Sequence, residues 1–259
     1  MGEKTVNQRI AVRSTYGNWV STKLLYIPGV LGVLFAALSV LFPWLAILAV
    51  VFLLCFAYFA YARWCFSPKG KNIQARIQSL LVDHFEWAGT GKVLDIGCGS
   101  GAVTIMVAKK YPDAHVTGID YWGRAWEYSK GVCEGNAQIE GVSDRVAFQK
   151  ASASSLPFDD ESFDAVISNL TFHEVADTED KGLLIQEALR VLKKGGVFAF
   201  QDLFYWKRVY GEVENLLDRA RSWGIESVEL INTSQSQFIP KALKLPFMVG
   251  TIGILRGRK

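Results

Sequence analysis

The chain has 259 residues, enough for one α/β domain and an additional segment, and hydrophobic residues make up 50% of it, a high share for a water-soluble protein. Its formal net charge is +3, but residues 1–76 carry eight basic residues and one acid, so the remainder of the chain is net negative. Positive charge concentrated beside an apolar segment argues against nucleic acid and for anionic lipid headgroups as the partner. The four scattered cysteines form no C-x-x-C pair, which argues against a disulfide framework or a zinc site.

The first element in chain order is an apolar block, which contains no charged residue from position 24 to position 62. Its two halves, Leu24–Leu41 and Trp44–Ala62, each approach the ~20 residues that cross a bilayer, and Pro43 breaks the pattern between them. Basic residues flank the block on both sides, and aromatic residues stand near its ends. The pattern predicts an integral membrane protein in which a basic lead (residues 1–23) precedes a transmembrane helical hairpin (residues 24–66), with both ends of the hairpin in the cytoplasm. A re-entrant hairpin is the main alternative, because the turn is very short.

A turn-rich linker and a lead-in helix at Ile73–Trp87 occupy residues 67–91 and precede a domain at residues 92–259. Helical patterns are expected between the first five strands of this domain, as in an α/β fold with a doubly wound, mostly parallel sheet. The expected strands are Lys92–Ile96, His115–Ile119, Val146–Gln149, Phe163–Ser168, Gly196–Gln201, Ser227–Ile231 and Met248–Leu255.

The junction after the first strand reads VLDIGCGSG (Val93–Gly101), with three glycines at alternate positions. Glycine allows positive φ and a close approach of backbone to a ligand. The second strand ends in Asp120, 19 positions after Gly101, where an acid can accept hydrogen bonds from ribose hydroxyls. These features predict a nucleoside-containing cofactor, and Ala102 in the third-glycine slot leaves a dinucleotide possible on spacing alone.

Two further blocks narrow this prediction: SSLPFDDESFDAVISN (Ser154–Asn169) and EALRVLKKGGVFAF (Glu187–Phe200). Together with the glycine block and GID (Gly118–Asp120), they make residues 92–200 resemble the class I S-adenosylmethionine-dependent methyltransferases, especially the branch of the quinone and sterol methyltransferases. The resemblance implies a Rossmann-like sheet of seven strands with the last one antiparallel, S-adenosylmethionine as the cofactor, and no metal ion.

The resemblance also implies a set of cofactor-binding residues. Asp95 and the glycine loop would hold the methionine part, Asp120 the ribose, and Tyr121 would pack beside the adenine. Ser152 stands where the family often has an aspartate that binds the adenine amino group, so this contact departs from the family pattern. The complete expected set is Asp95, Gly97, Gly99, Gly101, Asp120, Tyr121, Ser152, Ala153 and Asn169.

The substrate side of the site is expected just after the fourth and fifth strands, because ligands lie beyond the carboxyl ends of parallel strands. The candidate catalytic residues there are Asn169, His173 and Asp202. His173 is a candidate general base, since imidazole titrates near neutral pH; its alternative role is structural, and Asn169 could instead cap a turn. Trp122 and Trp126, after the ribose acid, are expected either to pack helices or to wall the site.

The combination predicts a membrane-anchored methyltransferase that acts on a lipophilic small molecule such as a lipid, a quinone, or a sterol-like or prenyl compound. The first alternative is a methyltransferase of a protein or a soluble metabolite that the hairpin merely localises. The second is a non-catalytic cofactor-binding assembly protein. The methyl acceptor and the oligomeric state stay open at this stage.

Overall fold

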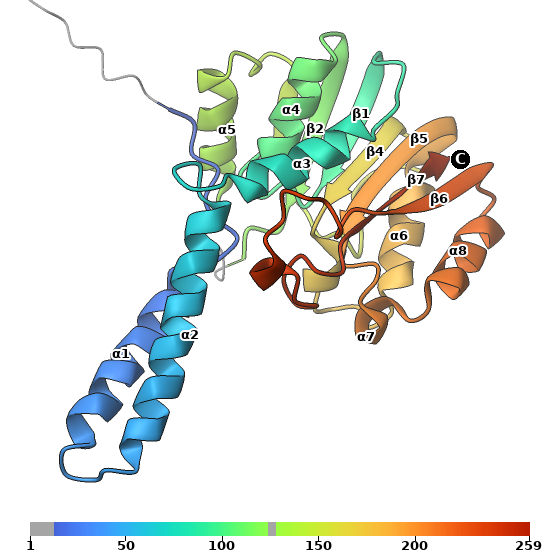
Figure 1. Cartoon of the computed structure of the whole chain (residues 1–259). Coiled ribbons are helices and arrows are strands. Elements are labelled where there is room, and N and C mark those ends of the chain that lie inside the picture. The colour runs from blue at the N-terminus through green and yellow to red at the C-terminus, as the bar shows by residue number, and fades with distance from the viewer. Residues whose placement is uncertain (1–12, 124–127) are drawn as a thin grey trace, which may run out of the picture.

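The structure, a computed structural model, describes residues 13–123 and 128–259 (Figure 1). Most of the predicted basic lead, residues 1–12, and the predicted Trp126 lie outside these ranges. A hairpin of two helices extends away from an α/β domain, in which one sheet is covered by helices on both faces.

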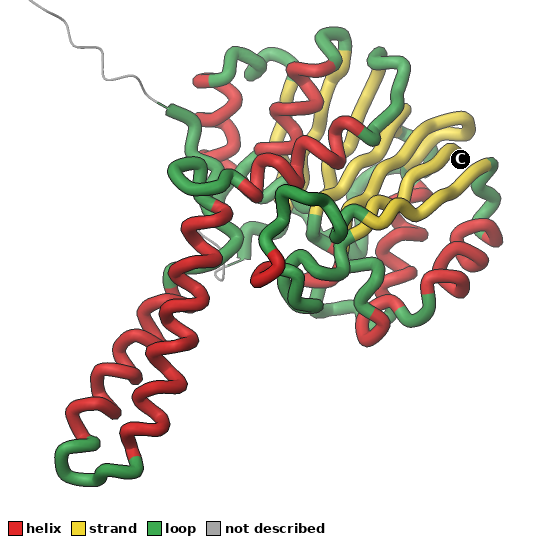
Figure 2. Tube along the Cα trace, viewed as in Figure 1, coloured by secondary structure: helices red, strands yellow, loops and turns green. Residues whose placement is uncertain are grey.

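The sheet has seven strands in the order β3-β2-β1-β4-β5-β7-β6, and β7 runs antiparallel to both of its neighbours. Figure 2 shows the strands as one sheet with helices beside it. The predicted α/β methyltransferase-type sheet is therefore confirmed. The strands are β1 (Gly91–Ile96), β2 (Ala114–Asp120), β3 (Val146–Lys150), β4 (Phe163–Asn169), β5 (Leu192–Asp202), β6 (Ser227–Asn232) and β7 (Gly253–Arg258).

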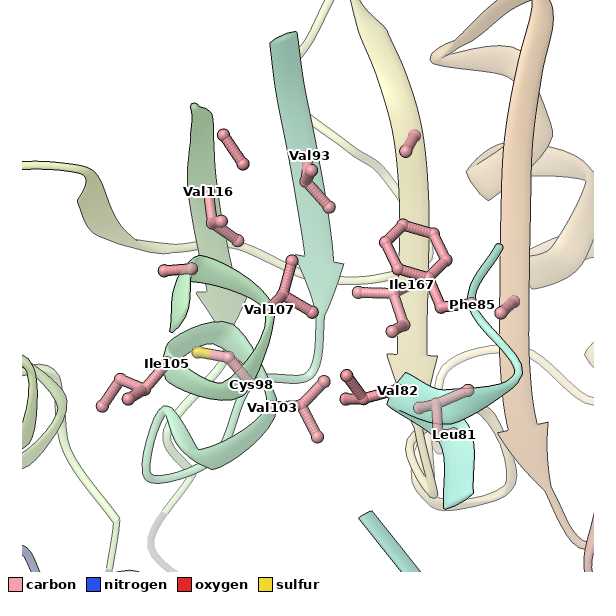
Figure 3. Close-up of a cluster of buried hydrophobic side chains, with 14 of the residues drawn as sticks. Leu81, Val82, Phe85, Val93, Cys98, Val103, Ile105, Val107, Val116 and Ile167 are labelled. Carbon is pink, nitrogen blue, oxygen red and sulfur yellow. The ribbon is translucent and has the colours of Figure 1, made fainter. Parts of the chain in front are cut away.

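Alternate residues of the central strands face two separate cores, because successive side chains in a strand point to opposite faces. On one face, Val93 and Ile167 pack against α3 (Ile73–Asp83), α4 (Ala102–Lys110) and α5 (Lys130–Ile139) (Figure 3). On the other face, buried strand residues pack against α6 (Lys181–Arg190) and α8 (Val213–Ser222). Both faces of the sheet are thus buried, which leaves the strand ends as the place for a ligand.

Two local predictions differ from the structure. The last strand begins at Gly253 instead of Met248, because the apolar residues before it pack against the hairpin instead of pairing in the sheet. Residues 151–162 contain turns and a bridge between Ser152 and Ser155 and no helix, although a helical pattern was expected between β3 and β4. Between β5 and β6 the chain forms two helices, α7 (Lys207–Tyr210) and α8, which are separated at Gly211.

The hairpin consists of α1 (Lys23–Leu38) and α2 (Leu45–Phe66), which lie side by side (Figure 1). Gly32 faces Leu53, so that a Cβ at position 32 would lie 2.8 Å from the leucine side chain; small residues allow this close approach. Among the described residues, α2 is the one helix long and apolar enough to cross a membrane, whereas α1 has 16 residues. The two-helix transmembrane hairpin therefore stays a prediction.

Where α2 meets the domain, a third group of buried residues forms what we call the base cluster. It joins the end of α2 to the start of α3, to the segment before α1 and to the loop between β6 and β7. Its buried members are Val20, Ala62, Cys65, Phe66, Ile73, Ile77, Leu203, Ile239, Leu243, Val249 and Ile252. This cluster fixes the hairpin to the same end of the sheet at which the strands β1, β2, β4 and β5 end (Figure 1).

Candidate functional site

The glycine loop connects the end of β1 to the start of α4, and its three glycines all have positive φ. Gly97 has a φ of +74°, and a Cβ there would lie 2.0 Å from the hydroxyl oxygen of Thr171. The backbone N–H groups of Gly97 and Cys98 donate to the carbonyl oxygen of Ile119 at 2.8 and 2.9 Å. The loop is thus held against the ends of β2 and β4 in a conformation that a larger residue at position 97 would disrupt.

Asp120 holds the same loop from the end of β2. Its Oδ2 accepts the N–H of Gly99 at 2.9 Å, and its Oδ1 accepts the N–H of Trp122 at 2.7 Å. The indole N–H of Trp122 donates to the carbonyl oxygen of Gly99 at 2.9 Å. A carboxylate oxygen can accept more than one hydrogen bond, so this carboxylate keeps lone pairs for ribose hydroxyls.

Two buried oxygen atoms near this loop have no hydrogen-bond partner among the described residues: Asp95 Oδ1 and Asn169 Oδ1. The other carboxylate oxygen of Asp95 accepts the Thr104 hydroxyl at 2.6 Å. Burial raises the pKa of Asp95 to about 7, and the charge of Asp120 adds to this effect. Buried acceptors without donors are costly, so both atoms are suited to a ligand that brings an ammonium group.

An unexpected carboxylate lies beside Ser152. The Ser154 hydroxyl donates to Asp177 Oδ2 at 2.6 Å, and the Ser152 hydroxyl lies 2.8 Å from that of Ser154. Asp177 belongs to the loop between β4 and α6, 25 residues from Ser152. The structure therefore places the Asp177 carboxylate near Ser152, the position at which the family often has an aspartate. No pattern in the neighbouring sequence could have indicated this contact.

These residues surround a cavity of about 560 Å³ at the carboxyl ends of β1, β2, β3 and β4. Of the predicted cofactor residues only Gly101 does not line it; Gly101 directly precedes α4, and a Cβ there would lie 3.1 Å from the Phe148 ring and 3.5 Å from the Cβ of Cys133. The predicted residues that line the cavity are Asp95, Gly97, Gly99, Asp120, Tyr121, Ser152, Ala153 and Asn169.

Residues from the segment before the hairpin also line the cavity, and the sequence did not predict this. The carbonyl oxygen of Tyr16 accepts the Ser100 hydroxyl at 3.1 Å and the Gln74 side-chain amide at 3.3 Å. The N–H of Trp19 donates to the Gln74 side-chain oxygen at 3.0 Å. Trp19 also packs against the base cluster. One wall of the cavity therefore contacts the foot of the hairpin, by which we mean the end of α2 at the base cluster.

The predicted catalytic residues His173 and Asp202 lie together but beside the cavity. His173 Nδ1 is 2.6 Å from Asp202 Oδ1, and Asp202 also accepts the backbone N–H groups of Phe172 and Leu203. Neither His173 nor Asp202 is among the described residues that line the cavity, whereas Asn169 is. Burial alone would lower the pKa of His173, but the Asp202 carboxylate outweighs burial and raises it to about 10. The imidazole is therefore protonated at neutral pH.

A metal centre finds no support within residues 13–123 and 128–259, where no three side chains of histidine, cysteine or acids are grouped as ligands would be.

Comparison with known proteins shows what this part of the chain is similar to. Residues 94–200 match the family model described as a methyltransferase domain. The chain is 32% identical over 140 residues to a sterol 24-C-methyltransferase of Gibberella zeae, covering 54% of this chain and 35% of the relative. It is 32% identical over 116 residues to a ubiquinone/menaquinone biosynthesis C-methyltransferase of Geotalea daltonii, covering 44% of this chain and 46% of the relative. The chain thus spans about a third to a half of these two relatives.

Among solved structures, geranyl diphosphate C-methyltransferase from Streptomyces coelicolor A3(2) matches with a TM-score of 0.54 and 16% identity. The match covers 73% of this chain and 80% of that chain, and it supports the fold. Residues 94–200 therefore match a methyltransferase domain, and the relatives that align with this segment are named as methyltransferases, which supports S-adenosylmethionine as the cofactor.

Proposed function

We propose that the whole protein is an S-adenosylmethionine-dependent methyltransferase held at a membrane by its hairpin, and that it methylates a lipophilic small molecule. The observation that carries this proposal is the shared wall between the cavity and the foot of the hairpin. Trp19 and Leu170 line the cavity and also pack against the base cluster, which contains Ala62 and Phe66 of α2. A methyl acceptor dissolved in the bilayer would thus reach the cavity with little exposure to water.

The cofactor would be held from three sides. The unpaired buried oxygens of Asp95 and Asn169 would receive its ammonium group, and the lone pairs of Asp120 would receive the ribose hydroxyls. β3 pairs with β2 next to Asp120, and Ser152 follows the end of β3. Because the nucleobase is attached to the ribose, it would lie towards Ser152. There Asp177 offers a carboxylate for an amino group of the base.

The acceptor side would be formed by the residues that follow β4. The bound cofactor supplies a methyl group on a positively charged sulfur, and transfer needs the acceptor atom aligned behind that group with water excluded. Leu170 has a φ of +52°, which is uncommon for a large side chain and keeps it between the cavity and the base cluster. The His173–Asp202 pair would position this loop, since Asp202 accepts the backbone N–H of Phe172.

The hairpin would place this site on the cytoplasmic face of the membrane, because basic residues flank its two ends. α1 is about 24 Å long, shorter than the ~30 Å hydrocarbon core. The turn between the helices is apolar: Val40 is 83% exposed, and the N–H groups of Ser39, Val40 and Leu41 donate to carbonyl oxygens in the last turn of α1. Pro43 has no N–H, so the turn is suited to remain inside the bilayer.

The names of the relatives support a lipophilic acceptor. The two curated relatives are methyltransferases named for a sterol and for ubiquinone and menaquinone, and the solved structure is one named for geranyl diphosphate. These names set the acceptor class that we propose for this chain.

The test has two steps and uses the full chain in detergent micelles. Calorimetry with S-adenosylmethionine should show binding, and Asp120→Ala should abolish it. Asp113→Ala is the matched control, because Asp113 is an exposed acid just before the opposite end of the same strand. Unchanged affinity in Asp120→Ala would refute the site assignment. The reconstituted protein is then given methyl-labelled cofactor and fractionated membrane lipids, and label found only in water-soluble products would refute the lipophilic acceptor.

A further inference from the structure

The loop between β6 and β7 lies against the hairpin, although nothing in the proposed chemistry requires this. It contains η2 (Lys241–Leu243), which lies beside the upper part of α2 (Figure 1). Ile239, Leu243 and Val249 bury their side chains in the base cluster, and the Tyr58 hydroxyl donates to the carbonyl oxygen of Ala242 at 3.1 Å.

The position of this contact along α2 sets the level of the loop. Arg63 is the first charged residue after the apolar block, and Tyr58 precedes it by five residues, about 7.5 Å along the helix axis towards the turn. Ala242 therefore lies at the level of the apolar part of α2, nearer to the turn of the hairpin than Arg63. Exposed Tyr61 and Trp64 lie on the same part of the helix, as expected at a membrane–water boundary. If α2 enters a bilayer, this loop is at the boundary.

The outward side chains of the loop have the composition of a membrane contact. Leu245 and Phe247, which are 36% and 54% exposed, alternate with the exposed Pro246, and Lys241 and Lys244 precede them. Outside the hairpin, the other exposed large hydrophobic residues of the described chain are separate from one another along the chain: Tyr121 just after β2, Ile139 on α5 and Leu183 on α6. An apolar tip beside lysines is typical of segments that insert shallowly among anionic headgroups.

We propose that residues 241–247 form a second membrane contact, in which Leu245 and Phe247 enter the lipid interface and Lys241 and Lys244 bind anionic headgroups. This inference rests on the proposed membrane location of the hairpin. The occupant is the surface of an anionic bilayer, because the loop continues the hairpin at the level of its boundary. The contact fixes the tilt of the domain, so that the wall made by Trp19 and Leu170 stays next to the lipid.

The experiment uses the full chain in phosphatidylcholine vesicles with and without about a third of phosphatidylglycerol. A photoreactive benzoylphenylalanine replaces Phe247, and lipid adducts are measured by mass spectrometry. Leu183 on α6 is the matched negative position, because it is exposed to a similar extent, 49%. Val50 on α2, 56% exposed, reports insertion of the hairpin itself.

We expect adducts at 247 and 50 and none at 183. Adducts at 50 with none at 247 would overturn this inference and leave the membrane anchor intact. Absence of adducts at both positions would overturn the anchor as well. Adducts at all three positions, or a crosslink between two copies at 247 without lipid, would also overturn the inference. The Lys241→Gln/Lys244→Gln variant should lose severalfold in adduct yield at 247 only in the anionic vesicles; equal losses in both would refute the role of charge.

Discussion

The pair of His173 and Asp202 offers a quantitative test of how the loop after β4 is held. His173 Nδ1 lies 2.6 Å from the buried Asp202 carboxylate, and the pKa of His173 is raised from 6.5 to about 10. A pKa that is raised on folding stabilises the fold fully below the unfolded value and ceases to do so as pH rises through the folded value. The stabilising effect is therefore greatest below pH 6.5 and disappears as the pH rises through about 10.

The size of the effect follows from the shift. At ~1.4 kcal/mol per pH unit, a pKa of about 10 corresponds to about 3 kcal/mol at pH ~7.5 and about 1 kcal/mol at pH ~9.5. This is a large part of the roughly 5–15 kcal/mol that is typical of a folded domain. Replacing His173 with Gln should remove the part of the free energy of unfolding that depends on the titration of His173. It should also leave the Asp202 carboxylate without its positively charged partner.

The assay compares the free energy of unfolding of the wild type and His173→Gln across this pH range in the same micelles. Other tyrosines and lysines titrate in both proteins, so the difference between the two isolates His173. Glu174, 3.5 Å from Nε2, and the buried Tyr210 are the other titratable groups that face the pair. The free energy of unfolding of the wild type minus that of His173→Gln should fall by about 2 kcal/mol between pH ~7.5 and ~9.5.

A direct measurement is also accessible, because the chain has three histidines. Nuclear magnetic resonance of ¹³C-labelled histidine rings, assigned with His173→Gln, should show the His173 signal unchanged until the pH is well above 8. A midpoint at or below 6.5 would refute the reasoning. It would also favour the prediction that His173 acts as a general base, since a neutral imidazole could accept a proton at physiological pH.

Three further predictions concern the glycine loop, the proposed contact of Asp177 with the nucleobase and the turn of the hairpin. Gly97→Ala should abolish cofactor binding in calorimetry, because the new Cβ lies 2.0 Å from a hydroxyl oxygen, whereas Gly131→Ala, with no atom within 4 Å, should bind normally; equal binding by both would contradict the loop geometry. Asp177→Asn should weaken S-adenosylmethionine binding about tenfold, and adding Ser152→Asp should restore it; no change in the single variant would exclude this contact. Val40→Cys in sealed vesicles should resist a membrane-impermeant maleimide added to either side, and labelling from the lumen would show that the turn crosses the bilayer.

The sequence predicted those parts of the site that depend on neighbours along the chain. The glycine loop and Asp120 are recognisable because each lies at the end of an apolar strand and within one βαβ unit. Asp177 and Tyr16 could not be predicted, since each reaches the cavity through contacts across the fold, with Ser154 and with Ser100. The start of β7 was misplaced for the same reason: Met248 is apolar because it packs against the base cluster.

Parts of the chain that the sequence separates into a lead, a hairpin and an enzyme domain are joined in the structure around one cavity. Tyr16 accepts hydrogen bonds from Ser100 in the glycine loop and from Gln74 in α3, and α1 begins at Lys23, seven residues later. A movement of the hairpin relative to the sheet must therefore disturb the glycine loop, because the connection is too short and too well bonded to absorb it. Loss of the segment before the hairpin would open one wall of the cavity, because Tyr16 and Trp19 line it. If the hairpin rests in a membrane as we propose, its depth in the lipid would also set where the cavity lies.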